Sequence, residues 1–166
     1  DVQDIRVKMN LLYEANKDKL RSIALYNNKG ALMMAEPVAN QKENVDITGQ
    51  EWFEQAMNKT ENMHFSTPHI QNLFDDSTFR YYWVISLSRA VEITNEGRSE
   101  LGVLLVDMDY SVMSRMLDQI NATDNGQYYY LCDSSGEIIY HPRRIQISDK
   151  ISSENNEIAA GYKDGV

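Results

Sequence analysis

Two stretches of this sequence share one pattern, and the pattern restricts the folds that the chain can adopt. LYNNKGALMM (residues 25–34) and LCDSSGEIIY (residues 131–140) each contain an apolar run, three polar residues, a glycine and a second apolar run, with Gly30 and Gly136 in the same place. This pattern is typical of a β-hairpin, because the polar residues and the glycine form the turn between two strands. A chain of 166 residues has room for one good core and the beginning of another. We therefore expect each hairpin to open its own antiparallel sheet.

The rest of the chain alternates between helical and extended patterns. We predict helices over residues 1–20, 48–58 and 111–120, extended segments over 21–35, 64–70, 79–93 and 100–110, and the second hairpin over 128–141. Thr48, paired with Glu51 in a capping box, and Ser111 are the predicted helix caps. Antiparallel strands with a few helices define an α+β fold. The order predicts a PAS-like antiparallel five-stranded sheet with a long N-terminal helix, plus the opening hairpin of a second PAS-like domain.

The first helix is long for a domain of this size, since about 20 helical residues span about 30 Å. Its apolar residues fall at three- and four-residue steps, interrupted by Asn16: Val2, Ile5, Met9, Leu12 and Leu20. One interpretation lays this helix across its own sheet. The other makes it a stalk that also pairs with a second copy of the chain, because the steps resemble a heptad repeat.

Charge and cysteine content exclude several partners and sites. The formal net charge of −9 and the pI near 4.8 argue against nucleic acid and anionic membranes as partners, since both repel an acidic surface. The single cysteine, Cys132, excludes an internal disulfide and a cysteine-rich zinc site, and we expect it to be a small buried residue. The sequence contains no long apolar span and begins at Asp1, so we interpret it as a segment of a longer protein.

Six pieces of the sequence, taken in order, resemble a known family. They are IALYNNKGALM, DITGQEWFEQA, FSTP, YWVISLSRAV, LGVLLVDMDYSVMSRML and GQYYYLCDSSGEIIYHP. In these pieces the chain resembles the double Cache domain, the extracytoplasmic sensor of many bacterial histidine kinases and chemoreceptors. The resemblance covers nearly the whole chain, up to about Pro142.

The resemblance implies a division of the chain and a location for it. Residues 1–22 would form a stalk helix, residues 23–110 a membrane-distal PAS-like ligand-binding domain, and residues 111–166 a connecting helix with a partial membrane-proximal PAS-like domain. The parent protein would be a membrane-anchored receptor, with a sensor histidine kinase as the favoured type, and this segment would lie outside the cytoplasm.

Aromatic and polar residues suggest a ligand site on one face of the predicted sheet. Trp52 and Phe53 lie on the short helix that we expect to cover the sheet. Tyr82 and Trp83 are adjacent in the long strand and must face opposite sides. Ser86 and Ser88 share the face of Tyr82, which makes that face the more polar one and the predicted ligand side.

Asp107 is the sharpest candidate for a polar anchor. It ends the buried run LGVLLVD, where a carboxylate is costly unless a partner neutralises or hydrogen-bonds it. One interpretation makes Asp107 the anchor for a ligand ammonium group. The alternative makes it a solvated strand-end residue or a cap of the following turn, and Asp109 is able to take either part. The predicted ligand-binding residues are Trp52, Phe53, Tyr82, Ser86 and Asp107.

The resemblance also bears on the kind of ligand. Amino-acid-sensing members of the family carry a pattern of Tyr, four residues, Arg, one residue, Trp and Tyr, with a downstream Asp. In this sequence the corresponding positions are Val45, Gln50, Trp52 and Phe53, with Asp107 as the counterpart of the Asp. The missing Arg would provide a bidentate grip on an α-carboxylate. We therefore expect a cation or a neutral polar molecule, held by aromatic faces and one acid.

No pattern in the sequence indicates catalysis. His64 and His69 are five residues apart around Pro68, a poor spacing for metal chelation, and phosphate-binding, nucleophile-elbow and paired-carboxylate motifs are absent. We predict no catalytic residue, metal or cofactor. Two interpretations remain open. One is a ligand-sensing module, and the other is a structural or protein-interaction module without a small-molecule ligand, which dimerises through its first helix and whose site is filled by Trp52 and Tyr82.

Overall fold

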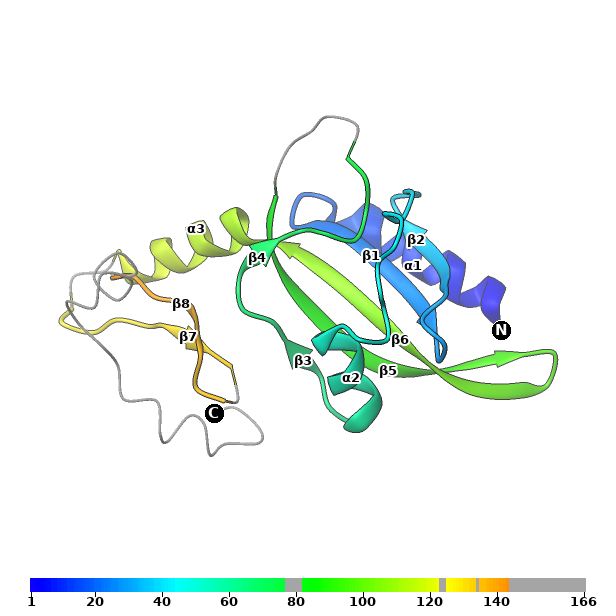
Figure 1. The fold of residues 1–166 in the computed structure, drawn as a ribbon. Helices are drawn as coiled ribbons and strands as arrows, with labels where there is room; N and C mark the ends of the chain where they lie inside the picture. Colours follow the sequence, from blue (N-terminus) through cyan, green and yellow to red (C-terminus); the bar gives the residue numbers. More distant parts are fainter. Residues whose placement is uncertain (77–81, 123–124, 134, 144–166) are drawn as a thin grey trace.

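The computed structural model describes residues 1–76, 82–122, 125–133 and 135–143 (Figure 1). The elements follow in the order α1 (Val2–Asn16), β1 (Leu20–Asn27), β2 (Leu32–Glu36), α2 (Glu51–Asn58), β3 (His64–Phe65), β4 (His69–Ile70), β5 (Trp83–Asn95), β6 (Arg98–Asp109), α3 (Tyr110–Asn121), β7 (Leu131–Cys132) and β8 (Ile138–Tyr140). Residues 79–81 of the predicted strand 79–93 and residues 144–166 of the predicted second domain lie outside the described residues.

The main sheet is antiparallel and has the order β2-β1-β6-β5-β3, with β4 also paired to β5. Strands β3 and β4 pair with successive parts of the same edge of β5, so they are one edge strand interrupted between Phe65 and His69. Pro68 lies in the interruption, where its missing N–H does not break the ladder. The sheet is therefore five strands wide, and the α+β, PAS-like prediction is confirmed.

Strands β5 and β6 form a long hairpin that carries much of the candidate site. Their pairing runs from Val84 opposite Asp109 to Asn95 opposite Arg98, and its tip extends beyond the end of β1 (Figure 1). The register places Ser86 opposite Asp107. Because side chains alternate along a strand, these two residues lie on one face of the sheet.

Each face of the sheet is covered by a different helix (Figure 1). On one face, α1 contributes Met9 to a buried cluster with Ile23, Leu25, Met34, Ile93 and Val106. On the other face, α2 contributes Phe53 and Ala56 to a cluster with Ala24, Tyr26, Ile47, Leu73, Phe74, Val103 and Leu105. The interpretation that lays the first helix across its own sheet is confirmed.

The first helix is shorter than predicted. It ends at Asn16, whose side-chain amide donates to the carbonyl of Leu12 at 2.9 Å, and Leu20 begins β1 instead of continuing the helix. Leu20 pairs with Met108 in the sheet, so strand pairing outweighs the helical spacing there. Leu12, predicted to lie on the packed side, is 48% exposed.

Both predicted helix caps are wrong in identity. Helix α2 begins at Glu51 after Gln50, and the Thr48 hydroxyl donates to the carboxylate of Asp46 at 3.1 Å. Helix α3 is capped by Asp109, to which Ser111 donates. At α3 the carboxylate of Asp109, a stronger acceptor than a hydroxyl, accepts from the amide of Val112 in place of Ser111. At α2 the N-cap residue Gln50 makes no side-chain capping bond, and Asp46 accepts from the amide of Gly49 in the preceding loop.

The repeated sequence pattern does form the same turn twice. The Asn27 side chain accepts from the amides of Lys29 and Ala31 at 3.0 and 2.9 Å, and the Asp133 side chain accepts from those of Ser135 and Glu137 at 2.9 Å each. Gly30 and Gly136 have φ values of +78° and +87°, which side-chain-bearing residues rarely adopt. Both predicted hairpins are confirmed.

The second hairpin packs against the helix that leads to it. The Tyr140 hydroxyl donates to Asp118 on α3 at 2.6 Å, and the amide of Tyr129 donates to Asn121 at 2.6 Å. Cys132, predicted to be buried, is only half-buried because β7 and β8 form a sheet of two short strands. Within the described part of the chain, no helix is both long and apolar enough to cross a membrane.

Candidate functional site

Asp107 lies almost completely buried on the α2 side of the sheet. It is 2% exposed, accepts a hydrogen bond from the Ser86 hydroxyl at 2.5 Å, and is also hydrogen-bonded by Ser22 on β1. Burial raises the pKa of Asp107 above its ordinary value, while Ser86, the nearby His69 and Ser22 partly offset this rise. Within the described residues, no Lys or Arg forms an ion pair with Asp107.

A chain of polar side chains connects Asp107 to the split edge strand. His69 Nε2 lies 3.3 Å from the Ser86 hydroxyl, and its Nδ1 lies 2.9 Å from the carbonyl of Thr67. The Ser66 hydroxyl accepts from the amide of Ser86 at 2.9 Å. We call Ser22, Ser66, His69, Ser86 and Asp107 the Asp107 cluster. Ser86 and Ser22 bond the carboxylate directly, and His69 and Ser66 contact Ser86, so the cluster supplies hydrogen bonds but no salt bridge.

Tyr26 on β1 lies on the same face of the sheet as Asp107, and the sequence alone did not single it out. It is 0% exposed, and its ring centroid lies 5.3 Å from that of Trp52. Among the described residues, no group forms a hydrogen bond with its hydroxyl. Burial, followed by the charge of Asp107, raises the pKa of Tyr26. The sequence did contain a signal for this placement. Ser22 and Tyr26 are an even number of residues apart on one strand, so their side chains face the same side of the sheet.

The structure gives Trp52 and Phe53 different roles. Phe53 is 4% exposed and belongs to the core beneath α2. Trp52 is half-buried and packs against both Tyr26 and Phe53, with ring centroids 5.3 and 5.8 Å apart. The Ser88 hydroxyl donates to the carbonyl of Trp52 at 2.9 Å, which ties α2 to β5. Of the two aromatic residues, Trp52 therefore lies nearer to solvent.

Tyr82 is not part of the long strand. It precedes β5, is half-buried, and lies under the guanidinium of Arg21, whose carbon is 3.8 Å from the ring centroid. Alternation along a strand therefore does not apply to Tyr82, and its ring contact is with Arg21, not with the Asp107 cluster. Trp83, the first residue of β5, is 53% exposed.

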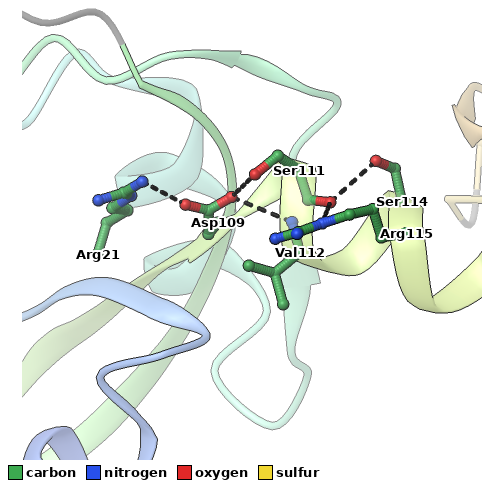
Figure 2. Close-up of polar contacts among 6 residues, drawn as sticks. All are labelled: Arg21, Asp109, Ser111, Val112, Ser114 and Arg115. Carbon is green, nitrogen blue, oxygen red and sulfur yellow. Dashed lines mark hydrogen bonds and ion pairs between the residues drawn. The ribbon is translucent and has the colours of Figure 1, made fainter.

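Of the two aspartates, Asp107 and Asp109, it is Asp109 that has the structural role of capping the following helix. Figure 2 shows its carboxylate between Arg21, which forms an ion pair at 2.5 Å, and the start of α3, where it accepts from Ser111 and from the amide of Val112 at 2.6 and 3.2 Å. Although burial alone would raise the pKa of Asp109, these donors and Arg21 lower it. Asp109 is thus satisfied by the protein, whereas Asp107 has no ion-pair partner among the described residues.

We expect Asp109→Ala to lower the free energy of unfolding by about 2 kcal/mol, because it removes the helix cap and the ion pair together. Asp109→Asn keeps a capping oxygen and should lose about half as much. Since the folded pKa of Asp109 is lowered, its contribution is present above the ordinary aspartate pKa of 3.8 and disappears as the pH falls through the folded value. Urea unfolding of both variants at neutral and acidic pH measures this, and equal stability of Asp109→Ala and wild type would contradict it.

The positions that correspond to the amino-acid-sensing pattern lie at the start of α2. Gln50, in the place of the Arg, donates its side-chain amide to the carbonyl of Asp46 at 3.1 Å, so it stabilises its own loop. The described residues contain no group of three or more His, Cys, Asp or Glu side chains arranged to hold a metal ion.

A five-strand-wide antiparallel sheet with one helix on each face is the architecture of a PAS-like α+β domain, and here one face carries a buried carboxylate. The family model of the Cache domain matches residues 1–165, and the chain belongs to this family, in its double Cache form. No curated protein matches the sequence.

Solved structures share the fold at low sequence identity. The ligand-binding domain of the Pseudomonas fluorescens chemoreceptor CtaA in complex with L-serine is 21% identical, with a TM-score of 0.56 over 82% of this chain and 55% of that one. The ligand-binding domain of the Pseudomonas aeruginosa chemoreceptor PctB in complex with L-Arg is 16% identical, with a TM-score of 0.59 over 88% and 52%. The extracellular domain of a proposed histidine kinase, vpHK1S-Z8, is 12% identical, with a TM-score of 0.50 over 86% and 54%. The chain thus spans about half the length of these structures.

Proposed function

We propose that this chain is the extracytoplasmic ligand-sensing part of a membrane-anchored signal-transduction receptor, and that it binds a small cationic molecule through Asp107. The observation that carries this proposal is a carboxylate only 2% exposed that has hydroxyl donors but no ion-pair partner within the described residues. Burying a charge without a counter-charge is costly, and a ligand ammonium group would supply that counter-charge.

The chemistry around Asp107 favours an amine over a standard α-amino acid. L-serine and L-Arg, the ligands of the two similar chemoreceptor domains, both carry an ammonium group, which a buried carboxylate is suited to hold. They also carry an α-carboxylate, for which a bidentate Arg is the usual partner. This chain has Gln50 in that place, and its side chain is already bonded to Asp46. We therefore propose amines without an α-carboxylate as the ligand class, with Trp52 as an aromatic wall.

Ligand entry requires part of the covering layer to move. Asp107, Ser86 and Tyr26 are each at most 3% exposed, and α2 covers this face of the sheet. The bond from Ser88 to the Trp52 carbonyl holds α2 in place. A ligand that binds only when α2 has shifted would stabilise the shifted arrangement, and this differential affinity is what a sensor needs in order to signal.

A thermal-shift screen tests the proposed function. The purified protein is heated with amines, amino acids, organic acids, sugars and nucleobases. A ligand present at a hundred times its Kd should add about 2.7 kcal/mol of stability, which raises the Tm by several degrees. We expect hits among amines. Hits confined to sugars or organic acids would contradict the assignment, and no hit in any class would favour the protein-interaction interpretation.

We also propose that the receptor dimerises through α1. Val7 and Leu11 are one helical turn apart and 53% and 63% exposed, whereas Met9 is buried against the sheet. An apolar strip on the outer side of a helix fits a second copy of the same helix. The division of the chain that we propose places this strip on the stalk helix of residues 1–22, followed by the distal domain (23–110) and the opening of the proximal domain (111–166).

We expect Leu11→Glu to shift the protein to a monomer, because it places a charge at the centre of this apolar strip. Size-exclusion chromatography with light scattering, over a range of concentrations, measures the change. Asn62→Glu adds the same charge at an exposed position after α2 and should leave the mass unchanged. A wild-type protein that remains monomeric at every concentration would contradict dimerisation through α1.

A further inference from the structure

The Tyr26 hydroxyl is a buried polar group that the fold itself does not explain. Tyr26 is 0% exposed, and none of the described residues forms a hydrogen bond with its hydroxyl oxygen. The side chains that form its buried cluster are apolar and include Ala24, Phe53 and Leu105. A buried hydroxyl without a partner destabilises the folded state, whereas a Phe at this position would fill the same space at no such cost.

We propose that the Tyr26 hydroxyl is a second polar contact of the ligand site, donating a hydrogen bond to an acceptor on the bound molecule. The inference rests on the proposed function and narrows its ligand class. The ligand would carry an ammonium group for Asp107 and, several bonds away, a hydroxyl or carbonyl oxygen for Tyr26. Asp107 would then select for an ammonium group, and Tyr26 would select, among amines, those that carry a hydrogen-bond acceptor.

The sheet geometry places the two groups on one surface. Ser22, which pairs with Asp107 across β1 and β6, is four residues before Tyr26 on the same strand and the same face. Four residues of strand span about 13 Å, and Asp107 is near enough for its charge to raise the pKa of Tyr26. Trp52 is half-buried and packs on Tyr26, so the residue that covers Tyr26 also reaches solvent.

The protonation state of Tyr26 is consistent with a donor. Burial and the charge of Asp107 both raise its pKa, so the phenol stays protonated at neutral pH. His69, His64 and Asp109 lie on the same face of the sheet, and His69 is placed against Ser86 and Thr67 in the Asp107 cluster. A protonated phenol offers one hydrogen, which selects ligands that present an acceptor.

The experiment uses Tyr26→Phe and a matched series of probes. Amino alcohols of two to six carbons are compared with n-alkylamines that have the same number of heavy atoms, by calorimetric titration and thermal shift. In the wild type we expect the best-fitting amino alcohol to bind about tenfold more tightly than its matched alkylamine. Tyr26→Phe should abolish this preference, leave the affinity for the alkylamine unchanged, and leave the Tm of the free protein equal or higher. Tyr13→Phe, on the opposite face of the sheet, is the control.

The remaining outcomes separate the two proposals. A Tyr26→Phe protein with a lower Tm and an unchanged preference would overturn the inference, because the hydroxyl would then have a structural role. A wild type that binds both probe series equally, and loses both in Asp107→Asn, would overturn the role of Tyr26 while supporting the proposed function. A wild type that binds no amine of either series would overturn both.

Discussion

Asp107→Asn is expected to weaken the binding of amine ligands about a hundredfold, because it removes the only buried carboxylate that faces the proposed ligand within the described cluster. The substitution is nearly isosteric, and the amide oxygen can still accept a hydrogen bond from Ser86. The domain should therefore fold normally. At neutral pH its free energy of unfolding should be higher than that of the wild type by about 1 kcal/mol, since a buried charge has been removed.

The pH dependence of Asp107 gives the same prediction a second signature. Because its folded pKa is raised above the ordinary value of 3.8, the folded state binds more protons than the unfolded state between these two values. The stability of the ligand-free wild type should therefore fall as the pH rises through this window, while its affinity for a cation rises. Asp107→Asn should lose both dependences, which thermal unfolding and titration at several pH values would measure.

The matched control for this variant is Asp18→Asn, which removes the same charge at an exposed position after α1. It should change neither ligand affinity nor the pH profile. If Asp107→Asn bound every ligand as tightly as the wild type, Asp107 would be a structural acceptor for Ser22 and Ser86, and the anchor would have to lie elsewhere.

Gly102→Ala is expected to lower the free energy of unfolding by about 3 kcal/mol, with a Tm lower by about 10 °C. A Cβ at this position in β6 would collide with the end of the Ile93 side chain and with the backbone carbonyl of Tyr26. The Ile93 side chain can rotate, but the carbonyl belongs to the neighbouring strand β1 and cannot move without separating the strands. Because the displaced carbonyl is that of Tyr26, ligand binding should weaken as well.

Gly97→Ala is the control for this substitution, and both changes are measured by thermal and urea unfolding. Gly97 lies at the tip of the β5–β6 hairpin with a φ of +77°, and an added Cβ there would meet no atom within 4 Å. It should cost about 1 kcal/mol, from backbone strain alone. Equal losses in the two variants would show that β1 and β6 are less closely packed at Gly102 than the structure indicates.

Local patterns in the sequence were sufficient to predict the elements and the fold class. The two hairpins follow from their turn residues, since Asn27 and Asp133 bond the turn amides and the glycines supply a positive φ. The position of Asp107 at the end of a buried run already indicated a costly carboxylate, and Trp52 and Phe53 already indicated that the short helix covers the sheet. These features depend on neighbours a few residues apart, which a sequence displays directly.

Only the tertiary structure showed which of the candidate residues lie together on the α2 face of the sheet. The sequence favoured Asp107 as the anchor but left Asp109 able to take the same part, and only the contacts of Asp109 with Arg21 and the amide of Val112 separated their roles. Tyr26 packs against Trp52, and the Tyr82 ring packs against Arg21. Both contacts are between segments that are distant in the sequence. Alternation along a strand fixes which face a side chain takes, but it does not reveal where the strand begins or which residues pack on that face. Those depend on the packing of the whole sheet and its two helices.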